Sequence, residues 1–384
     1  MPTSKRLSNA VCTMAAIIVA AGCGHDTGNR AAVDTSALQP GNYRTLPRTA
    51  AEVRTPENVD IQEALRLAEF VPLIMDTDPR LVFGRVRYQR KMYTQLDPPE
   101  LTDNFSVEVP GFRVGWETSG QRRAEQTLGR AVELTVLRFA EPAQAAHAAK
   151  YLSDRALTGR YPPVATIAIP GYAEAFGQVG QHDSVSTWAA HGEYLVKTFI
   201  GPGVDIPPDH TVLAELTRAV LDRQFERLRE YRPTSPEKLP ELPVDTDEIL
   251  RHALPAEEGE SEAVMSPAVA LHFSERPDLT KRAIEDAQVD LVMRGETEIY
   301  RASDAAAAER FAAYLDSRLD PAYEIIDTPP GMPGAHCTEN PEETGSFRCV
   351  FTNGRYTVLV DGADQIQELH QKTAAQYLLL DDLT

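Results

Sequence analysis

Between Val132 and Ala156, hydrophobic residues first form a dense run and then recur every three or four positions. The segment VELTVLRF, 132–139, is rich in the branched and apolar side chains that favour a β-strand. A helical apolar stripe follows, formed by Ala145, Ala148, Leu152 and Ala156. Pro142 suits the first helical turn, where its missing N–H costs nothing. The pattern therefore predicts a strand followed by a helix.

The same pattern occurs a second time from Gly295, in GETEIYRASDAAAAERFAAYLDSRLD. A single offset of 163 residues relates the two copies, placing Val136 on Ile299, Arg138 on Arg301, Tyr151 on Tyr314, and Gly171 on Gly334. One gap-free offset extends from a strand through a helix to a Pro-Gly turn, which an Ala-rich helix alone would not produce. We interpret it as an internal duplication and expect both copies to share one topology.

Each copy continues into a predicted hairpin and a closing helix. The first hairpin turns near His191-Gly192, and the second turns at Asn353-Gly354, a strong short-range hairpin signal. Tyr194 then corresponds to Tyr356, at an offset of 162. The closing helices place apolar positions at helical spacing, Leu213, Leu216, Val220 and Leu228 in the first copy and Ile366, Leu369, Thr373 and Tyr377 in the second. This order predicts an α+β fold of two related domains, each an antiparallel sheet with helices packed on one face.

The N-terminus predicts export. Lys5 and Arg6 precede an uncharged apolar run from Ala10 to Gly22, which is too short to span a bilayer and is typical of a signal peptide. Val19-Ala20-Ala21-Gly22-Cys23 resembles the bacterial lipobox, which predicts a lipidated Cys23. The alternative is an ordinary signal peptide cleaved beside a cysteine. We expect a signal peptide over 1–22 and a lipidated, flexible tether over 23–40.

Proline marks the boundary between the predicted domains. Arg232 to Pro243, RPTSPEKLPELP, contains four prolines and is typical of a semi-rigid spacer. We therefore expect a first α+β domain over 41–232, a Pro-rich linker over 233–244 and a second α+β domain over 245–384.

Two segments near the start of the mature chain carry a family resemblance. VDTSALQPGNYRTLPR, followed by EALRLAEFVPLIMDTDPRLV, resembles the opening motifs of an uncharacterised lipoprotein family of mycobacteria and related mycolic-acid-containing actinobacteria. The resemblance implies two related α+β domains attached to the cell envelope. It implies no known activity, substrate or cofactor.

Charge limits the partners that the chain can have. The formal net charge is −19, and removing Lys5 and Arg6 with the leader brings it to −21. Nucleic-acid binding requires a basic surface, so we expect no nucleic-acid partner. The same acidity opposes binding to an anionic membrane, so attachment to the outer face of the cell membrane must come from the lipid on Cys23.

The cysteines beyond the leader predict one disulfide. With Cys12 removed and Cys23 lipidated, Cys337 and Cys349 remain as a pair in an oxidising compartment. The alternative is a zinc site that includes His336 and His370. Because His336 and Cys337 are adjacent, their side chains point apart in an extended chain, so we expect the disulfide and no metal.

The chain contains no motif that predicts catalysis. G-x-S-x-G, Walker and G-x-G-x-x-G motifs are absent, so no cofactor is expected, and Ser235-Pro236-Glu237-Lys238 fits S-x-x-K only within a Pro-rich linker. Arg138 and Arg301 occupy equivalent strand ends and could bind an anion, although an arginine lying along a sheet edge is the commoner case. We expect a non-catalytic protein that binds an unknown small molecule or envelope component. An envelope hydrolase with a site of scattered residues and a purely structural lipoprotein are the alternatives.

Overall fold

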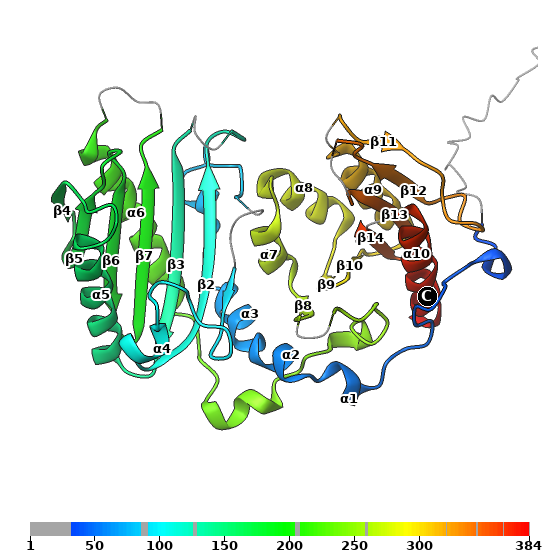
Figure 1. The fold of residues 1–384 in the computed structure, drawn as a ribbon, viewed down its shortest axis with the longest axis horizontal. Coiled ribbons are helices and arrows are strands. Elements are labelled where there is room, and N and C mark those ends of the chain that lie inside the picture. Colours follow the sequence, from blue (N-terminus) through cyan, green and yellow to red (C-terminus); the bar gives the residue numbers. More distant parts are fainter. Residues whose placement is uncertain are drawn as a thin grey trace, which may run out of the picture.

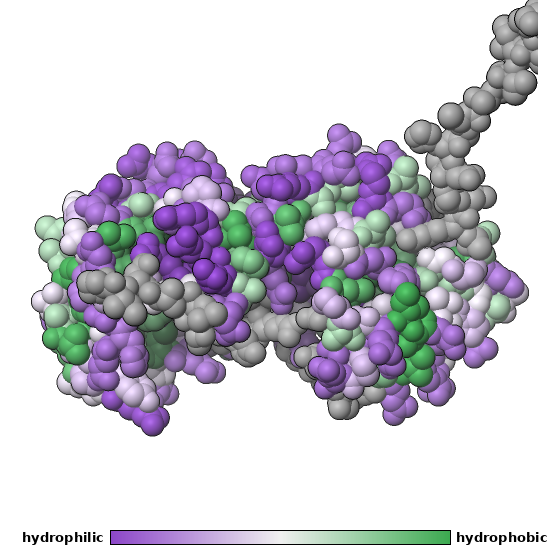
Figure 2. All heavy atoms as spheres, turned by 90° about the horizontal axis from the view of Figure 1, so that it is seen from above, coloured by the Kyte–Doolittle hydropathy of each residue, from purple (hydrophilic) through white to green (hydrophobic). Residues whose placement is uncertain are grey.

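The computed structural model describes residues 32–383, apart from 86–90, 126–128, 204–207, 258–259, 320, 343–344 and 364. The predicted signal peptide and Cys23 lie outside the described residues. Two separate seven-stranded sheets organise the chain, each accompanied by helices (Figure 1). Seen from above, they form two lobes that meet at a narrower middle (Figure 2).

The first sheet is antiparallel throughout. In chain order its strands are β1 (Met92–Tyr93), β2 (Phe112–Gln121), β3 (Ala131–Phe139), β4 (Ala165–Ile169), β5 (Tyr172–Val179), β6 (Val185–His191) and β7 (Tyr194–Gly201). Their order across the sheet is β1-β2-β3-β7-β6-β5-β4. Its helices are α4 (Phe105–Glu108), α5 (Pro142–Leu157) and α6 (His210–Leu228).

The second sheet repeats this plan. Its strands are β8 (Ala263–Met265), β9 (Leu291–Arg294), β10 (Thr297–Arg301), β11 (Glu324–Ile325), β12 (His336–Glu339), β13 (Phe347–Asn353) and β14 (Tyr356–Ala363). Their order, β8-β9-β10-β14-β13-β12-β11 when it is read from the opposite edge, matches the first sheet strand for strand. All of these pairs are antiparallel too. The predicted duplication and the two predicted hairpins are therefore confirmed.

The register of the central strands is also repeated. Arg138 lies opposite Tyr194 in the first sheet, and Arg301 lies opposite Tyr356 in the second. The Pro-Gly turn is repeated less closely. Gly171 has a φ of +79° in the tight β4–β5 turn, whereas the longer β11–β12 connection has its positive φ at Gly331 and not at Gly334.

The expectation that helices cover one face of each sheet is wrong. In the first domain, Leu137 of β3 packs in one core with Ala148 of α5, whereas Val136 packs in another with Val220 of α6. Neighbouring residues of a strand point to opposite faces, so α5 and α6 lie on opposite faces of the sheet. The cause is visible in β3, which buries apolar side chains on both faces.

The second domain has the same three layers. Its equivalent helices are α9 (Ala305–Ser317) and α10 (Ile366–Leu380). Val350 of β13 packs with Ala312 of α9, whereas Phe351 packs with Leu369 of α10. Asp304 caps α9 by accepting a hydrogen bond from the Ala307 N–H at 2.8 Å.

A short helical segment of the second domain joins the two sheets. It consists of α7 (Pro267–Ala270), η5 (Leu271–Phe273) and α8 (Pro277–Ala287), which lie between the sheets in Figure 1. The indole of Trp116, fully buried on β2, lies 5.5 Å from the His272 ring and 5.8 Å from the Phe273 ring. His272 also hydrogen-bonds through Nδ1 to the hydroxyl of Thr118 at 2.9 Å. The two domains therefore share one hydrophobic core here.

Residues 32–54 lie against the second domain, in contrast to the expected tether through residue 40 and first domain from residue 41. The Asp34 N–H donates to the Gly331 carbonyl at 2.8 Å, and Arg48 forms a buried ion pair with Glu262 at 2.6 Å. The chain then enters the first domain through α2 and α3, and it returns through the Pro-rich linker. The remaining elements are η1 (Thr35–Ala37), α1 (Ala50–Val53), α2 (Pro56–Asp60), α3 (Gln62–Ala68), η2 (Ile74–Asp76), η3 (Pro236–Glu241), η4 (Thr246–Glu248) and η6 (Asp381–Leu383).

Candidate functional site

A cavity of about 550 Å³ lies where the chain crosses between the domains. Its walls come from α2, the start of α3, the segment after β1, the strands β2 and β3, and the linker helix η3. The apolar part of the wall consists of Pro56, Val59, Leu96, Val114, Pro236, Leu239 and Pro240. Its charged part consists of Arg54, Arg113, Arg138, Asp60 and Glu63. The volume is within the range of about 300–1,000 Å³ that is usual for small-molecule sites.

Local sequence signals build two of these walls. Thr55 caps α2 by accepting a hydrogen bond from the Asn58 N–H at 3.1 Å, and Pro56 occupies the first helical position. The linker forms the 3₁₀-helix η3, with Pro236 at its start. Proline fixes φ, so this wall loses little conformational freedom when it packs.

Arg138 enters the cavity from the end of β3. It lies opposite Val114 on β2 and opposite Tyr194 on β7, so these side chains share one face of the sheet. Its Nε donates to Glu193 Oε1 at 2.8 Å, and its side chain is 15% exposed. Among the described residues, no other hydrogen bond engages this guanidinium. Two of its nitrogens are therefore available to a ligand.

The Arg113 side chain has no hydrogen bond or ion pair with any residue that the structure describes. It sits where the register between β2 and β3 shifts, between Phe112 and Val114. Such an irregularity re-aims a strand side chain. The cavity thus contains a second arginine without a compensating carboxylate of its own.

Glu63, in contrast, has one carboxylate oxygen, Oε1, hydrogen-bonded inside the protein, while Oε2 is buried and accepts no hydrogen bond from a described residue. Its Oε1 accepts hydrogen bonds from the Tyr231 hydroxyl at 2.5 Å and from the Thr234 N–H at 2.8 Å. Its Oε2 lies 3.2 Å from Arg66 Nε. Burial, and then the charge of Glu63, raise the pKa of the Tyr231 hydroxyl, which therefore stays protonated as a donor. The negative charge of Glu63 is thus balanced locally by Arg66.

In the second domain, the equivalent arginine, Arg301, is paired with carboxylates of the chain itself. Arg301 forms two hydrogen bonds to the Asp290 carboxylate, at 2.7 and 3.0 Å, and one to Asp247 at 2.6 Å. These bonds, first of all those to Asp290, raise the pKa of Arg301. Its guanidinium is saturated by the chain's own carboxylates, whereas Arg138 faces a cavity.

A second cavity, of about 530 Å³, shares Asp60 and Leu96 with the first. Phe273 and Ser261 of the second domain line it, together with Lys91 of the first. Burial lowers the pKa of Lys91 to about 8, against the opposing effect of Glu117 and Glu133. Leu96, which lines both cavities, is 67% exposed, so much of its apolar side chain is in contact with solvent.

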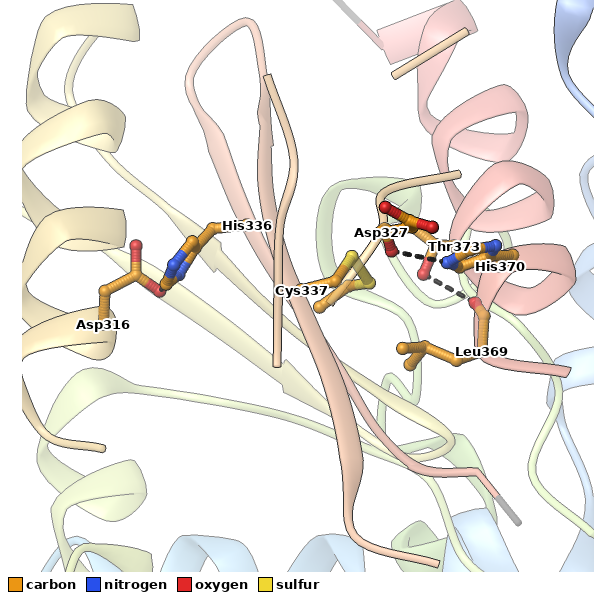
Figure 3. Close-up of a disulfide and its surroundings, with 8 residues drawn as sticks. Asp316, Asp327, His336, Cys337, Leu369, His370 and Thr373 are labelled. Atoms are coloured by element: carbon orange, nitrogen blue, oxygen red, sulfur yellow. Dashed lines mark hydrogen bonds and ion pairs between the residues drawn. A yellow bond between two sulfur atoms is a disulfide. The ribbon is translucent and has the colours of Figure 1, made fainter. Parts of the chain in front are cut away.

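The cysteine pair lies far from these cavities, on neighbouring strands of the second sheet. Cys337 of β12 is directly opposite Cys349 of β13, with 4.1 Å between their Cα atoms, and a disulfide joins them. Figure 3 shows His336 and His370 on opposite sides of this strand pair. His336 Nδ1 lies 2.9 Å from Asp316, and His370 Nε2 lies 2.8 Å from the Asp327 carbonyl oxygen. The two histidines and the cysteines therefore do not converge on one point.

No group of three or more histidine, cysteine, aspartate or glutamate side chains in the part of the chain that the structure describes could hold a metal ion. None of the helices within the described ranges is long and apolar enough to cross a membrane.

Sequence reasoning selected Arg138 but missed the residues around it. Arg113, Leu96 and Glu63 come from three separate segments that only the folded chain brings together. The one local signal was proline, because Pro56 and the linker prolines form rigid walls of the cavity.

Comparison with known families matches both halves of the chain. The model of the N-terminal domain of unknown function DUF7373 matches residues 50–244, and that of the C-terminal DUF7373 domain matches residues 244–382. A search of curated proteins finds no match. Among solved structures, the extracellular domain of PknH from Mycobacterium tuberculosis aligns over 47% of this chain and 99% of that chain, with 8% identity and a TM-score of 0.28. This TM-score is too low to indicate a shared fold.

Proposed function

The chain belongs to the DUF7373 family of domains of unknown function, and from that premise we propose that it is a non-catalytic ligand-binding protein of the cell envelope. The ligand occupies the cavity beside Arg138, which we call the Arg138 cavity. The protein is exported and held on the outer face of the membrane by a lipid on Cys23.

The contrast between the two copies carries the proposal. Duplication placed an arginine at the same register position in both sheets, opposite Tyr194 in one and Tyr356 in the other. In the second copy, Arg301 is paired with Asp247 and Asp290. In the first copy, Arg138 lines a cavity of about 550 Å³. A buried arginine is stabilised by compensating charge, so the first copy is the one suited to take that charge from a ligand.

The anchor is supported by the N-terminal sequence. A basic start, an uncharged apolar run and a cysteine after small residues agree with a lipoprotein signal. Several acyl chains on one residue exceed what stable anchoring needs, so the acidic surface is no obstacle.

Binding of a neutral apolar fluorophore, such as N-phenyl-1-naphthylamine, tests the ligand site. The Arg138 cavity should bind the probe and enhance its emission, and Leu239→Trp, which fills the cavity from the linker wall, should abolish the effect. Ile325→Trp is the matched control, because Ile325 is 77% exposed on a strand of the second domain. Equal probe binding by all three proteins would refute the site, and no binding by the parent protein would favour a purely structural role.

A further inference from the structure

We propose that the ligand class is an amphiphile with one anionic head group and an uncharged apolar body. This inference rests on the proposed function, since it describes the occupant of the Arg138 cavity. Three features of that cavity carry it: the balance of its charges, the character of its remaining wall, and the position of its exposed leucine.

The charges in the wall leave a local excess of cations. Glu63 is balanced by Arg66, and Arg138 is paired through one nitrogen with Glu193. Among the described residues, the Arg54 side chain donates only to the backbone carbonyl of Leu242, at 3.0 Å. Arg113 donates to no described residue. Asp60 is the one wall carboxylate that forms no ion pair with a described residue, and its Oδ2 accepts a hydrogen bond from the Leu96 N–H at 3.3 Å.

This excess stands out because the whole chain is strongly acidic, with a net charge of −19. Long-range attraction would therefore favour cationic ligands. A guanidinium, however, recognises carboxylate, sulfate or phosphate oxygens through paired N–H donors at short range. Arg113 and Arg138 approach the cavity from adjacent strands, with Val114 of β2 directly opposite Arg138. The head group of the ligand is therefore an oxyanion that lies at this end of the sheet.

The rest of the wall is suited to an apolar body. Val59 and Pro56 of α2 line the cavity together with Leu239 and Pro240 of the linker, and all four side chains are apolar. Leu96 extends this apolar surface to the opening, where it is 67% exposed. Covering an exposed leucine with an apolar tail is favourable, at about 25 cal/mol per Å² of apolar area removed from water. A small free oxyanion would leave this surface uncovered.

Three ligands with the same decyl chain separate the alternatives: decyl sulfate, decanol and decyltrimethylammonium. Isothermal titration below their micelle concentrations should show one decyl sulfate bound per protein, at least tenfold more tightly than the other two. In Arg113→Gln/Arg138→Gln, decyl sulfate affinity should fall at least tenfold while decanol affinity is unchanged. Arg310→Gln, which changes an exposed arginine paired with Asp286 on the second domain, is the matched control and should bind as the parent protein does.

Other outcomes overturn different parts of the account. Decanol or the cation binding as tightly as decyl sulfate, with loss in Leu239→Trp, would refute the anionic class and leave the cavity as a ligand site. Inorganic sulfate binding as tightly as decyl sulfate would refute the amphiphile in favour of a small oxyanion. Binding of several decyl sulfate molecules, unaffected by either Arg113→Gln/Arg138→Gln or Leu239→Trp, would refute the proposed function as well.

Discussion

Arg138 and Arg301 occupy the same register position in two sheets of identical strand order, but their surroundings differ. Arg301 is held by two carboxylates and is 9% exposed, whereas Arg138 is held by one and lines a cavity. Two positions related by duplication begin with the same surroundings, so the different ion pairs of Arg138 and Arg301 mark a place where the two domains have diverged.

Their replacement should therefore affect stability unequally. Arg301→Gln leaves Asp247 and Asp290 without their cation and should lower the free energy of unfolding by about 2 kcal/mol. The loss is modest because both carboxylates are 57% exposed and partly screened by solvent. Arg138→Gln removes a single pair and should cost less, about 1 kcal/mol. Urea unfolding followed by circular dichroism makes the comparison, and equal losses would contradict the assigned roles.

Acid should weaken the joint between the domains through His272. Burial, assisted by the charge of Lys91, lowers the pKa of His272 to about 3, below its ordinary value of about 6.5. Between these values the unfolded chain binds a proton that the folded protein does not, so stability is lost as pH falls from about 6.5 towards 3. The slope is at most about 1.4 kcal/mol per pH unit.

His272→Gln removes this titration and still offers a polar partner to Thr118. Carboxylates also titrate in this range, so the informative quantity is the stability of the parent protein minus that of the variant. This difference should shrink steadily between pH 6 and pH 4 in urea unfolding experiments. A difference that stays constant with pH would show that His272 binds its proton as readily in the folded protein as in the unfolded chain.

The Cys337–Cys349 bond should be present in the exported protein. It closes a loop with a sequence separation of 12, for which chain entropy gives a stabilisation of about 3 kcal/mol. Non-reducing peptide mapping should recover the linked peptides, and Cys337→Ala/Cys349→Ala should destabilise the second domain. The first sheet contains no cysteine and should keep its hydrogen-exchange protection. Two free thiols, or bound zinc, would refute the bond.

Membrane attachment should depend on Cys23. Cys23→Ala prevents lipidation and should move the protein from the membrane fraction to the soluble fraction, because a net charge of −19 does not hold it on an anionic surface. Cell fractionation with a high-salt wash and immunodetection gives the answer. A variant that still sediments with the membranes after that wash would exclude the lipid anchor.

The duplication could be predicted because equivalent apolar and turn positions keep nearly one spacing along the sequence. The placement of helices on both faces could not, because β3 was interpreted by its strand-forming composition alone. Val132, Leu134 and Val136 face α6, whereas Leu137 and Phe139 face α5. A strand buried on both faces has no alternation that would show where its helices lie.

Two other features of the structure were not predicted because they depend on contacts between residues far apart in the sequence. The Tyr43 hydroxyl donates to Glu368 at 3.3 Å across 325 positions, and this N-terminal segment has no local pattern that would assign it to the second domain. The Arg138 cavity combines α2, β2, β3 and the linker in the same way. One arginine of the site was predictable from its repeat, whereas its neighbours depended on the fold.

The location of the ligand is the central claim, and photo-crosslinking tests it most directly. A fatty acid that carries a diazirine on its alkyl chain would be bound to the protein, irradiated, and mapped by peptide mass spectrometry. The account predicts labelling concentrated on α2 (Pro56–Asp60) and on the linker helix η3 (Pro236–Glu241), and lost in Leu239→Trp. Labelling concentrated on the second domain, or spread over exposed residues and unchanged in Leu239→Trp, would contradict it.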